Sequence, residues 1–384
     1  MNIVLVSYPY LPGLGGVERS VHNLAHFLTA RGHKVLVVTH QEEGFPLSLE
    51  RDGGVRVLRV RIPSPFDRDW PRRVRIRFYD ALNGAVLALA GALFRPRIVH
   101  CHLINADTRY GEALARRTGA GLVISMRGGE TEHWIERRPD RVAYVAALLR
   151  RADRVTGVAR SLLEQAERLA PGVGSKAEVI PNPADPARIE GLRGAPRLRG
   201  GRPYLLFAGR LEDMKDVACL IDGYHRAVRL RPDFPWRLLI AGEGSLGPEL
   251  ERQAAEGPGA EGVEFVGRAS YPEALALIAG AELLALPSAF SEGCPNVILE
   301  AMALGTPTLV SSLPSLTELV EDGVTGAVFE LGDAESLSRR LLEAADDPEG
   351  RRAWAERARR KIEREHAPGA ILERIERIYR EVRP

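Results

Sequence analysis

The 384 residues of this chain are enough for two domains with complete hydrophobic cores. Hydrophobic residues make up 45% and charged residues 27%, a globular balance that argues against disorder. The net charge of +2, from 53 basic and 51 acidic residues, gives no overall case for nucleic-acid binding. Cys101, Cys219 and Cys294 are scattered and odd in number, which indicates a reducing compartment without a disulfide framework.

The chain opens on an apolar stretch, residues 1–7, that lacks the basic region and cleavage site of a signal peptide. We expect it to be the first strand, followed by a loop ending in GLGG and a helix over 17–30. A glycine loop between a strand and a helix is typical of a phosphate cradle. It is equally typical of a tight turn that needs positive φ. The loop has neither the full dinucleotide spacing nor a P-loop lysine, so both interpretations stay open.

Two further strands are predicted over 35–39 and 55–62, before an arginine-rich segment. Asp67 and Asp69 in that segment form a D-x-D pattern, which is one way to bind a metal. Surrounded by arginines and next to a proline, they read better as a salt-bridged loop.

The basic segment 68–77 leads into an apolar helix that contains residues 81–94. Such a segment could lie on an anionic membrane surface. We favour a helix packed on the sheet with a solvated basic end. The apolar run is shorter than the roughly 18 residues that cross a bilayer, so we expect a soluble or peripheral protein.

The segment RIVHCH, residues 97–102, predicts a buried strand on which His100 and His102 share one face and Cys101 the other. That alternation argues against a zinc site. His102 lies near the carboxyl end of the strand, where it is a candidate cleft residue.

Another strand, residues 121–126, is followed by Arg127, Gly128 and Glu130. Arg127 could hold a phosphate of a ligand, or it could be a structural cap. Glu130 is a weaker candidate for contact with a ligand.

The proline-rich segment VIPNPAD, residues 179–185, marks the end of the first domain. A Gly-, Arg- and Pro-rich stretch follows, as expected of a solvated linker. We therefore expect domains over 1–184 and 202–367, joined by a linker over 185–201. A final helix, residues 368–384, follows the break at Pro368 and Gly369.

Strands and helices alternate regularly in the second domain, which predicts a parallel sheet with right-handed crossovers. The expected strands are 204–209, 236–241, 262–266, 282–286, 306–310 and 327–330. Arg210 and Lys215 follow the first of them directly. Basic side chains just past a strand end, where a helix begins, are well placed to bind a diphosphate.

The stretch SEGCPNVILEAMA, residues 291–303, reads as a loop that enters a helix. Glu292 lies in the loop, Pro295 fits the first helical turn, and Glu300 lies one to two turns further on. Carboxylates beside a helix N-terminus suit the hydroxyls on either side of a phosphate, as in a nucleotide sugar. They also suit a capping carboxylate and a solvated helix face.

The pattern GRLxxxK at 209–215, followed by E-x7-E at 292–300, resembles the family 4 retaining glycosyltransferases of the GT-B fold. The segments 15–39, 97–102, 152–165, 179–185 and 238–246 also follow the order of that family. The resemblance implies an α/β protein of two Rossmann-like domains whose parallel sheets face a central cleft. The first domain would be the acceptor side, the second would bind the nucleotide sugar, and the last helix would cross back to the first.

The resemblance further implies hexosyl transfer with retention from a nucleotide sugar, with UDP favoured, to a glycan, lipid-linked or small-molecule hydroxyl acceptor. No metal or other cofactor is expected, and the protein is expected in the cytoplasm, peripheral on the inner face of the membrane if it binds there. Arg210, Lys215 and Glu292 are the expected catalytic residues. The expected donor-binding residues are Gly15, Gly16, Gly209, Arg210, Lys215, Glu243, Arg268, Glu292, Gly293, Cys294, Pro295, Asn296, Val297 and Glu300. The expected acceptor-side residues are His102, Arg127, Gly128 and Glu130.

One departure from the family concerns Arg127, since many relatives have histidine at this point. Two other functions remain open on the same scaffold: a nucleotide-sugar epimerase or hydrolase, and a non-catalytic sugar-binding protein.

Overall fold

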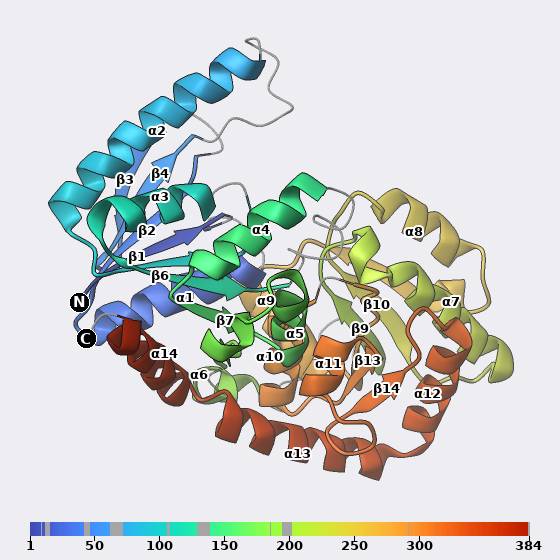
Figure 1. Ribbon diagram of the computed structural model, residues 1–384. Helices are drawn as coiled ribbons and strands as arrows, with labels where there is room; N and C mark the ends of the chain where they lie inside the picture. The colour runs from blue at the N-terminus through green and yellow to red at the C-terminus, as the bar shows by residue number, and fades with distance from the viewer. Residues whose placement is uncertain are drawn as a thin grey trace. The chain divides into compact units, whose positions relative to one another are not determined.

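The computed structural model describes residues 1–8, 10–11, 16–41, 47–61, 72–105, 108–128, 139–184, 186–193, 202–290 and 292–382. The chain forms two compact units (Figure 1). Unit 1 comprises Met1–Pro181 together with Gly369–Pro384, and unit 2 comprises Asn182–Pro368.

Unit 1 is built on an eight-stranded sheet of order β3-β4-β2-β1-β5-β6-β7-β8. Its strands are β1 (Asn2–Ser7), β2 (Lys34–His40), β3 (Leu47–Asp52), β4 (Val55–Val60), β5 (Ile98–His102), β6 (Gly121–Met126), β7 (Arg154–Gly157) and β8 (Ala177–Val179). All neighbouring pairs are parallel except β3 and β4, which form an antiparallel hairpin at the edge. Strand β3 was not predicted, because an exposed edge strand needs no apolar run and LSLERD contains none.

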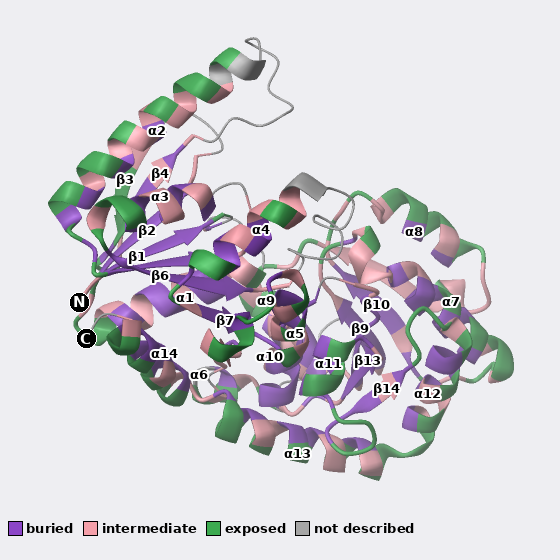
Figure 2. Cartoon of the chain, viewed as in Figure 1, coloured by how far each residue is buried: buried purple, intermediate pink, exposed green. Residues whose placement is uncertain are grey.

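The helices of unit 1, apart from the last, connect the strands of its sheet. They are α1 (Gly16–Ala30), α2 (Arg72–Phe94), α3 (Thr108–Thr118), α4 (Pro139–Arg151), α5 (Arg160–Leu169), the 3₁₀ turn η1 (Val173–Lys176) and the final helix α14 (Pro368–Val382). Figure 2 shows the central strands of this sheet almost wholly buried and the outer faces of the helices exposed, whereas the edge strands β3 and β8 are only partly buried.

The last helix completes the core of unit 1. Ile371, Ile375 and Tyr379 of α14 are buried in one cluster with apolar side chains of α1 and of the central strands. The Tyr379 hydroxyl lies 2.7 Å from Nδ1 of His100 on β5. A segment from the far end of the sequence therefore seals the first sheet.

A buried carboxylate fastens α14 to the turn between α1 and β2. Glu376, with its side chain 7% exposed, is 2.9 Å from Arg31 and 2.8 Å from His33. Burial raises the pKa of this carboxyl, but the bonds from Arg31 and His33 outweigh burial and leave the pKa below its usual range.

Helix α2 is longer than its apolar run suggested. By length and composition alone, Ile76–Phe94 is able to cross a membrane, and 17% of this window is buried. We expected the apolar run to be too short to span a membrane because we took it to begin at residue 81. The helix also contains the five residues before this point, of which only Arg77 and Asp80 are charged. One such helix is weak evidence for a span, because the core helix of a soluble protein can pass the same test. The basic segment 68–77 and the Asp67–Asp69 pattern lie largely outside the described residues.

Unit 2 contains a six-stranded, fully parallel sheet of order β11-β10-β9-β12-β13-β14. Its strands are β9 (Tyr204–Ala208), β10 (Arg237–Ala241), β11 (Val263–Gly267), β12 (Leu283–Leu286), β13 (Thr308–Ser311) and β14 (Ala327–Phe329). Each predicted strand of this domain is present within two residues of its expected start. The expectation of two parallel-sheet α/β domains is confirmed.

The helices of unit 2 connect these strands. They are α6 (Pro186–Ile189), α7 (Val217–Leu230), α8 (Gly247–Ala255), α9 (Tyr271–Gly280), α10 (Asn296–Leu304), α11 (Pro314–Leu319), α12 (Ala334–Asp346) and α13 (Pro348–Glu365), with the 3₁₀ turns η2 (Glu190–Leu192), η3 (Asp213–Lys215) and η4 (Ala260–Gly262).

The second unit begins earlier than the expected boundary at 202. Residues 186–192 are helical and belong to unit 2, although we expected them in a linker. An ion pair attaches this segment to the rest of unit 2, because Glu190 of η2 lies 2.7 Å from Arg359 of α13. Such a pairing across 169 residues leaves no trace in local composition.

Local signals fix several helix ends in unit 2. A capping box formed by Ser270 and Glu273 begins α9. Asp333 caps α12 by accepting bonds from the backbone N–H groups of Glu335 and Ser336. Helix α10 ends at Gly305, whose φ of 76° lies in the left-handed region that favours glycine.

Replacing Glu376 by glutamine should destabilise unit 1 by about 1–3 kcal/mol, because Arg31 and His33 lose a charged acceptor in a buried setting. A carboxyl whose folded pKa is depressed contributes stability that is present above the unfolded pKa and lost as pH falls through the folded one. The wild type should therefore lose more stability than Glu376→Gln below about pH 4. Urea unfolding at pH 7 and pH 3.5 measures both effects. The exposed Glu373 on the same helix gives the matched control, Glu373→Gln; equal losses in the two variants would contradict the assignment.

Candidate functional site

The order in which the chain adds strands to the sheet of unit 2 reverses between β9 and β12. From β9 the chain proceeds to β10 and β11 on one side, and from β12 to β13 and β14 on the other. In open α/β sheets, ligands bind at the carboxyl ends of the strands beside such a reversal. The loops that leave these two strands carry Arg210 and Lys215 after β9, and Glu292 after β12.

An ion pair joins the two loops. The ammonium of Lys215, at the end of η3, contacts Oε1 of Glu292. The side chains are only 13% and 8% exposed. The hydroxyl of the fully buried Ser288 donates to the same oxygen over 2.7 Å. The structure thus brings together two residues that stand 77 positions apart in the sequence.

Backbone bonds hold this ion pair in place. The Ala289 N–H donates to the Met214 carbonyl over 3.0 Å, so the loop after β12 is tied to η3. The Ser311 hydroxyl donates to the Ser288 carbonyl over 2.6 Å and links the same loop to β13. After Lys215, Asp216 turns the chain at φ 45° and caps α7.

Two glycines allow the loop after β10 to pack against the loop after β9. A Cβ at Gly242, whose φ is +154°, would overlap the Gly209 carbonyl, and a Cβ at Gly244 would overlap the Leu211 backbone. The Leu211 N–H donates to the Glu243 carbonyl over 3.0 Å. The close approach of two backbones is therefore the reason for the glycines in this loop.

Three of the expected donor residues are exposed on loops at the carboxyl edge of this sheet: Arg210 after β9, Glu243 after β10 and Arg268 after β11. The Arg210 guanidinium lies 3.6 Å from the Met214 sulfur. Within the described part of the chain, Arg210 makes no ion pair. Its charge is available to an anion, whereas the charge of Lys215 is shared with Glu292.

The loop into α10 is fixed by a residue far away in the sequence. The Asn182 side-chain amide donates to the Cys294 carbonyl over 2.8 Å and to Oδ1 of Asn296 over 3.2 Å. The Asn182 carbonyl in turn accepts from Nδ1 of the buried His366 over 2.8 Å. Burial lowers the pKa of His366. This role of Asn182 could not be predicted from the proline-rich segment around it, because its partners lie more than 100 residues away in the sequence.

Pro295 precedes α10 instead of lying in its first turn as expected, because its backbone is extended (φ −68°, ψ 123°). The helix begins at Asn296 and Val297, whose N–H groups come ahead of the first intrahelical bond. Gly293 is buried in the loop, and Glu300 is half-buried on α10 in the second turn, as predicted.

In unit 1, the residues expected on the acceptor side lie at the carboxyl ends of β5 and β6, which are neighbours. The Arg127 guanidinium donates to Nδ1 of His102 over 2.7 Å. Burial, His100 and Arg127 all lower the pKa of His102. His102 is therefore a neutral imidazole with its proton on Nε2. Gly128 follows at φ 96°.

Gly16 is the exposed first residue of α1, which places it in unit 1 as expected. Gly15 and Glu130 lie outside the described residues.

His100 has a structural part that the sequence did not reveal. The rings of His100 and His102 stack with centroids 3.9 Å apart, so the two share a face as predicted. Nε2 of His100 is 2.6 Å from the Ser125 hydroxyl, and Nδ1 is engaged by Tyr379 of the last helix. Burial, followed by Arg127, lowers the pKa of His100. This histidine therefore links the sheet to α14.

Two family models cover almost the whole chain. Residues 14–188 match the model described as Glycosyltransferase Family 4, and residues 189–361 match Glycosyl transferases group 1. A glycogen synthase of Mycobacterium tuberculosis is 30% identical over 391 aligned residues, which cover 94% of this chain and 90% of the relative. A phosphatidyl-myo-inositol mannosyltransferase of Mycobacterium leprae is 27% identical, with 85% and 83% covered.

Solved structures agree in fold. A sucrose-phosphate synthase from Thermosynechococcus elongatus superposes with a TM-score of 0.81 at 21% identity, covering 99% of this chain and 98% of the other. An Anabaena protein crystallised with UDP and glucose superposes with a TM-score of 0.76 at 19% identity, covering 98% of both chains. At these identities the likeness shows the fold alone.

Replacing Lys215 by methionine should cost about 3–5 kcal/mol of stability, because Glu292 is left buried without its partner. The double variant Lys215→Met/Glu292→Gln should lose less than the sum of the two single variants, because it leaves no unpaired charge. Chemical denaturation of the full chain measures the coupling. Simple additivity would show that the pair is not energetically linked.

Proposed function

This chain belongs to the family 4, group 1 glycosyltransferases, and we propose that it moves a hexosyl unit from a nucleotide sugar to a hydroxyl acceptor with retention at the anomeric carbon. The observation that carries the proposal is the buried Lys215–Glu292 pair beside the β9–β12 reversal. In a nucleotide sugar, the diphosphate and the hydroxyls of the sugar lie on either side of the bond to be broken. A cation held next to a carboxylate can bind both groups, because the cation attracts the diphosphate and the carboxylate accepts from a hydroxyl.

The main task of the site is to stabilise the departing diphosphate. As the bond between the anomeric carbon and the diphosphate oxygen breaks, negative charge grows on that oxygen. Arg210 supplies an exposed guanidinium for it, and Lys215 adds ammonium protons that the contact with Glu292 does not use. Gly15 and Gly16 are proposed to supply backbone N–H groups.

The carboxylates take the hydroxyl groups of the donor. Glu292 is proposed to accept a hydrogen bond from a hydroxyl of the sugar, and Glu300 from the hydroxyls of the nucleotide ribose. The backbone from Gly293 to Val297, with Gly209, Glu243 and Arg268, completes the proposed donor site.

No side chain is assigned as a nucleophile. The anomeric carbon passes through an oxocarbenium-like state, and the acceptor hydroxyl attacks the face that the diphosphate leaves. The acceptor proton passes to the departing phosphate oxygen, so the step needs neither a metal nor another cofactor.

UDP is the favoured nucleotide, and a protein of the same fold was crystallised with UDP and glucose. His102, Arg127 and Gly128, with Glu130, are proposed to face the acceptor. A glycan acceptor fits the glycogen synthase relative, and a lipid-linked one fits the mannosyltransferase relative. We place the reaction in the cytoplasm.

A two-step experiment tests the function. Thermal-shift screening of nucleoside diphosphates and their sugars identifies the donor, and NMR of the product formed with an acceptor panel shows its anomeric configuration. Transfer with retention that persists in EDTA supports the proposal. Inversion would overturn the assignment of retention. Isomerised or hydrolysed donor in place of transfer would indicate an epimerase or hydrolase, and binding without turnover would indicate a sugar-binding protein.

Two substitutions separate the proposed roles. Arg210→Ala should lower kcat by about 100-fold or more, the scale of losing one transition-state donor, with little change in stability because the side chain is exposed. Glu300→Ala should instead weaken binding of the free nucleoside diphosphate, measured by calorimetry. Arg352→Ala, on α13, is the control for loss of an exposed arginine. Wild-type kinetics in Arg210→Ala would remove its assignment.

Helix α2 supports a peripheral membrane contact for a lipid-linked acceptor. Its exposed apolar side chains include Phe78, Leu89 and Leu93, which are 52%, 62% and 77% exposed. Arginines at 72, 73, 75 and 77 precede or open the apolar part of the helix. Apolar side chains with basic neighbours are what an anionic membrane surface binds.

The double variant Leu89→Glu/Leu93→Glu should reduce co-sedimentation with phosphatidylglycerol vesicles by about tenfold or more, because each buried apolar side chain contributes about 1.5–3 kcal/mol. Leu230→Glu, at a 67% exposed leucine on α7 of unit 2, is the matched control. Equal sedimentation of the wild type and the α2 variant would rule out this contact surface.

A further inference from the structure

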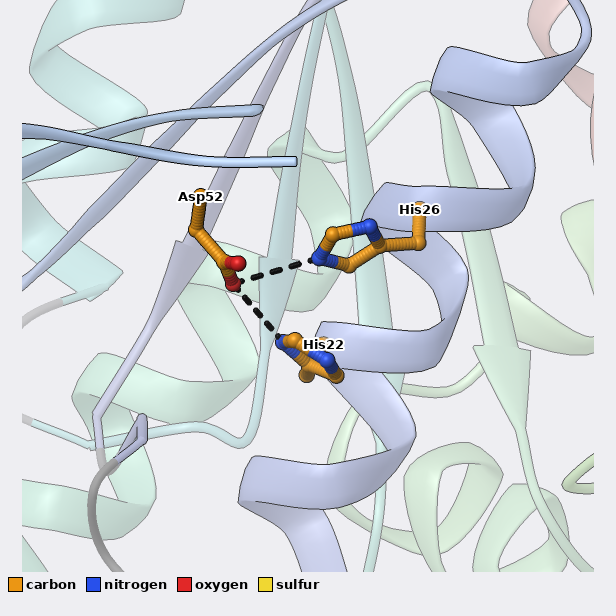
Figure 3. Close-up of side chains that lie close together, drawn as sticks. All are labelled: His22, His26 and Asp52. Carbon is orange, nitrogen blue, oxygen red and sulfur yellow. Dashed lines mark hydrogen bonds and ion pairs between the residues drawn. The ribbon is translucent and has the colours of Figure 1, made fainter. Parts of the chain in front are cut away.

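A second cluster of potential ligands lies in unit 1, on residues that the transfer reaction does not use. His22 and His26 are four positions apart on α1 and therefore project from the same face of that helix. Asp52, the last residue of β3, faces them (Figure 3). Among the described residues, this is the one group of three or more such side chains whose ligand atoms lie within 4.8 Å of one another.

The distances match those around a small tetrahedral ion. Nδ1 of His22 is 3.3 Å, and Nε2 of His26 is 3.2 Å, from the same carboxylate oxygen of Asp52. Two ligands of a tetrahedral Zn²⁺ with bonds of about 2.0–2.1 Å lie roughly 3.3 Å apart. The imidazole rings, with centroids 4.3 Å apart and tilted by 52°, both face the carboxylate from one side (Figure 3). Small side-chain rotations would bring all three atoms around one ion.

The backbone holds the carboxylate in position. Asp52 opens a two-residue turn, Gly53–Gly54, with φ values of 52° and 92°, and the turn leads directly into β4. A Cβ at Gly53 would come within 2.6 Å of the His26 ring. The turn therefore packs directly on the imidazole, and the hairpin and α1 present their ligands to each other without rearrangement of the main chain.

The surroundings suit a bound cation. The Tyr10 hydroxyl lies 3.4 Å from Nδ1 of His22 and would give up this contact when that nitrogen binds the ion. The three ligand side chains are 26%, 31% and 47% exposed, so an ion can enter and a water can fill the fourth position.

We propose that His22, His26 and Asp52 form a binding site for Zn²⁺ or a similar borderline divalent transition-metal ion. Two imidazoles and one carboxylate are a donor set that zinc accepts readily, whereas Mg²⁺ and Ca²⁺ prefer oxygen ligands only. The ion would join the edge hairpin β3–β4 to α1. Its part is structural, so the transfer step proposed above does not depend on it.

Calorimetric titration of the EDTA-stripped, dialysed full-length protein with ZnCl₂ tests the site. We expect one saturable equivalent in the wild type. His26→Gln and Asp52→Asn should each bind at least about tenfold more weakly, because each lacks a ligand but keeps a polar side chain of similar size. MgCl₂ should give no saturable binding at the same concentrations. His40→Gln, a histidine on β2 outside the cluster, should bind like the wild type.

Thermal unfolding gives an independent reading. Zn²⁺ at about 100 times the wild-type dissociation constant should raise the Tm of the wild type by several degrees and that of Asp52→Asn by no more than about half as much. Absence of a saturable equivalent in the wild type would overturn the proposal. So would wild-type affinity in both His26→Gln and Asp52→Asn.

Discussion

The organisation of unit 2 depends on one buried ion pair, Lys215–Glu292. Two charges removed from water cost several kcal/mol each in desolvation unless they meet each other and further hydrogen bonds. Here Ser288 provides such a bond, and the backbone bond between Ala289 and Met214 fixes the loops that carry the charges. Any arrangement that separates these loops leaves a charge unpaired in the protein interior. The edge of the sheet beside the β9–β12 reversal is therefore held in one geometry before a ligand arrives.

The points at which the chain passes between its units are also tied to each other. Asn182 begins unit 2, and His366 lies just before the chain returns to unit 1. A side-chain bond joins His366 to the Asn182 carbonyl, and the Ala184 N–H donates to the His366 carbonyl over 2.9 Å. Because the Asn182 amide also holds the loop into α10, the segment that enters unit 2 contributes directly to the proposed donor site.

The histidines of this chain show how one residue type takes different parts in different surroundings. His100 and His102 lie in the core of unit 1, where burial disfavours the charged form and both serve as neutral hydrogen-bonding groups. His22 and His26 lie on a helix surface beside a carboxylate, which suits them to a cation. Both pairs of histidines are close together in the sequence, so sequence spacing does not distinguish them. Their different roles arise from how far solvent reaches each pair and from the side chains beside it.

Local signals were enough for much of this architecture. Buried parallel strands are short apolar runs bounded by Gly, Pro or polar residues, so all six strands of unit 2 and most of those in unit 1 could be predicted from periodicity. The edge strand β3 could not be predicted in this way, because it pairs with a neighbouring strand along one edge only and its side chains are largely exposed. Arg210, Lys215, Glu292 and Glu300 could be singled out because basic and acidic residues follow strand ends in a recognisable order.

The pairing of those residues required the folded chain. Nothing in local sequence says that Lys215 meets Glu292, that Arg210 stays unpaired within the described residues, or that Asn182 supports the loop at Cys294. Each of these depends on which strands are neighbours and on how closely their loops approach. The same holds for the cluster of His22, His26 and Asp52, because the β3–β4 hairpin places Asp52 against the two histidines of α1. Periodicity reflects the conditions at a single element, whereas a site is made by contacts between elements that are distant along the chain.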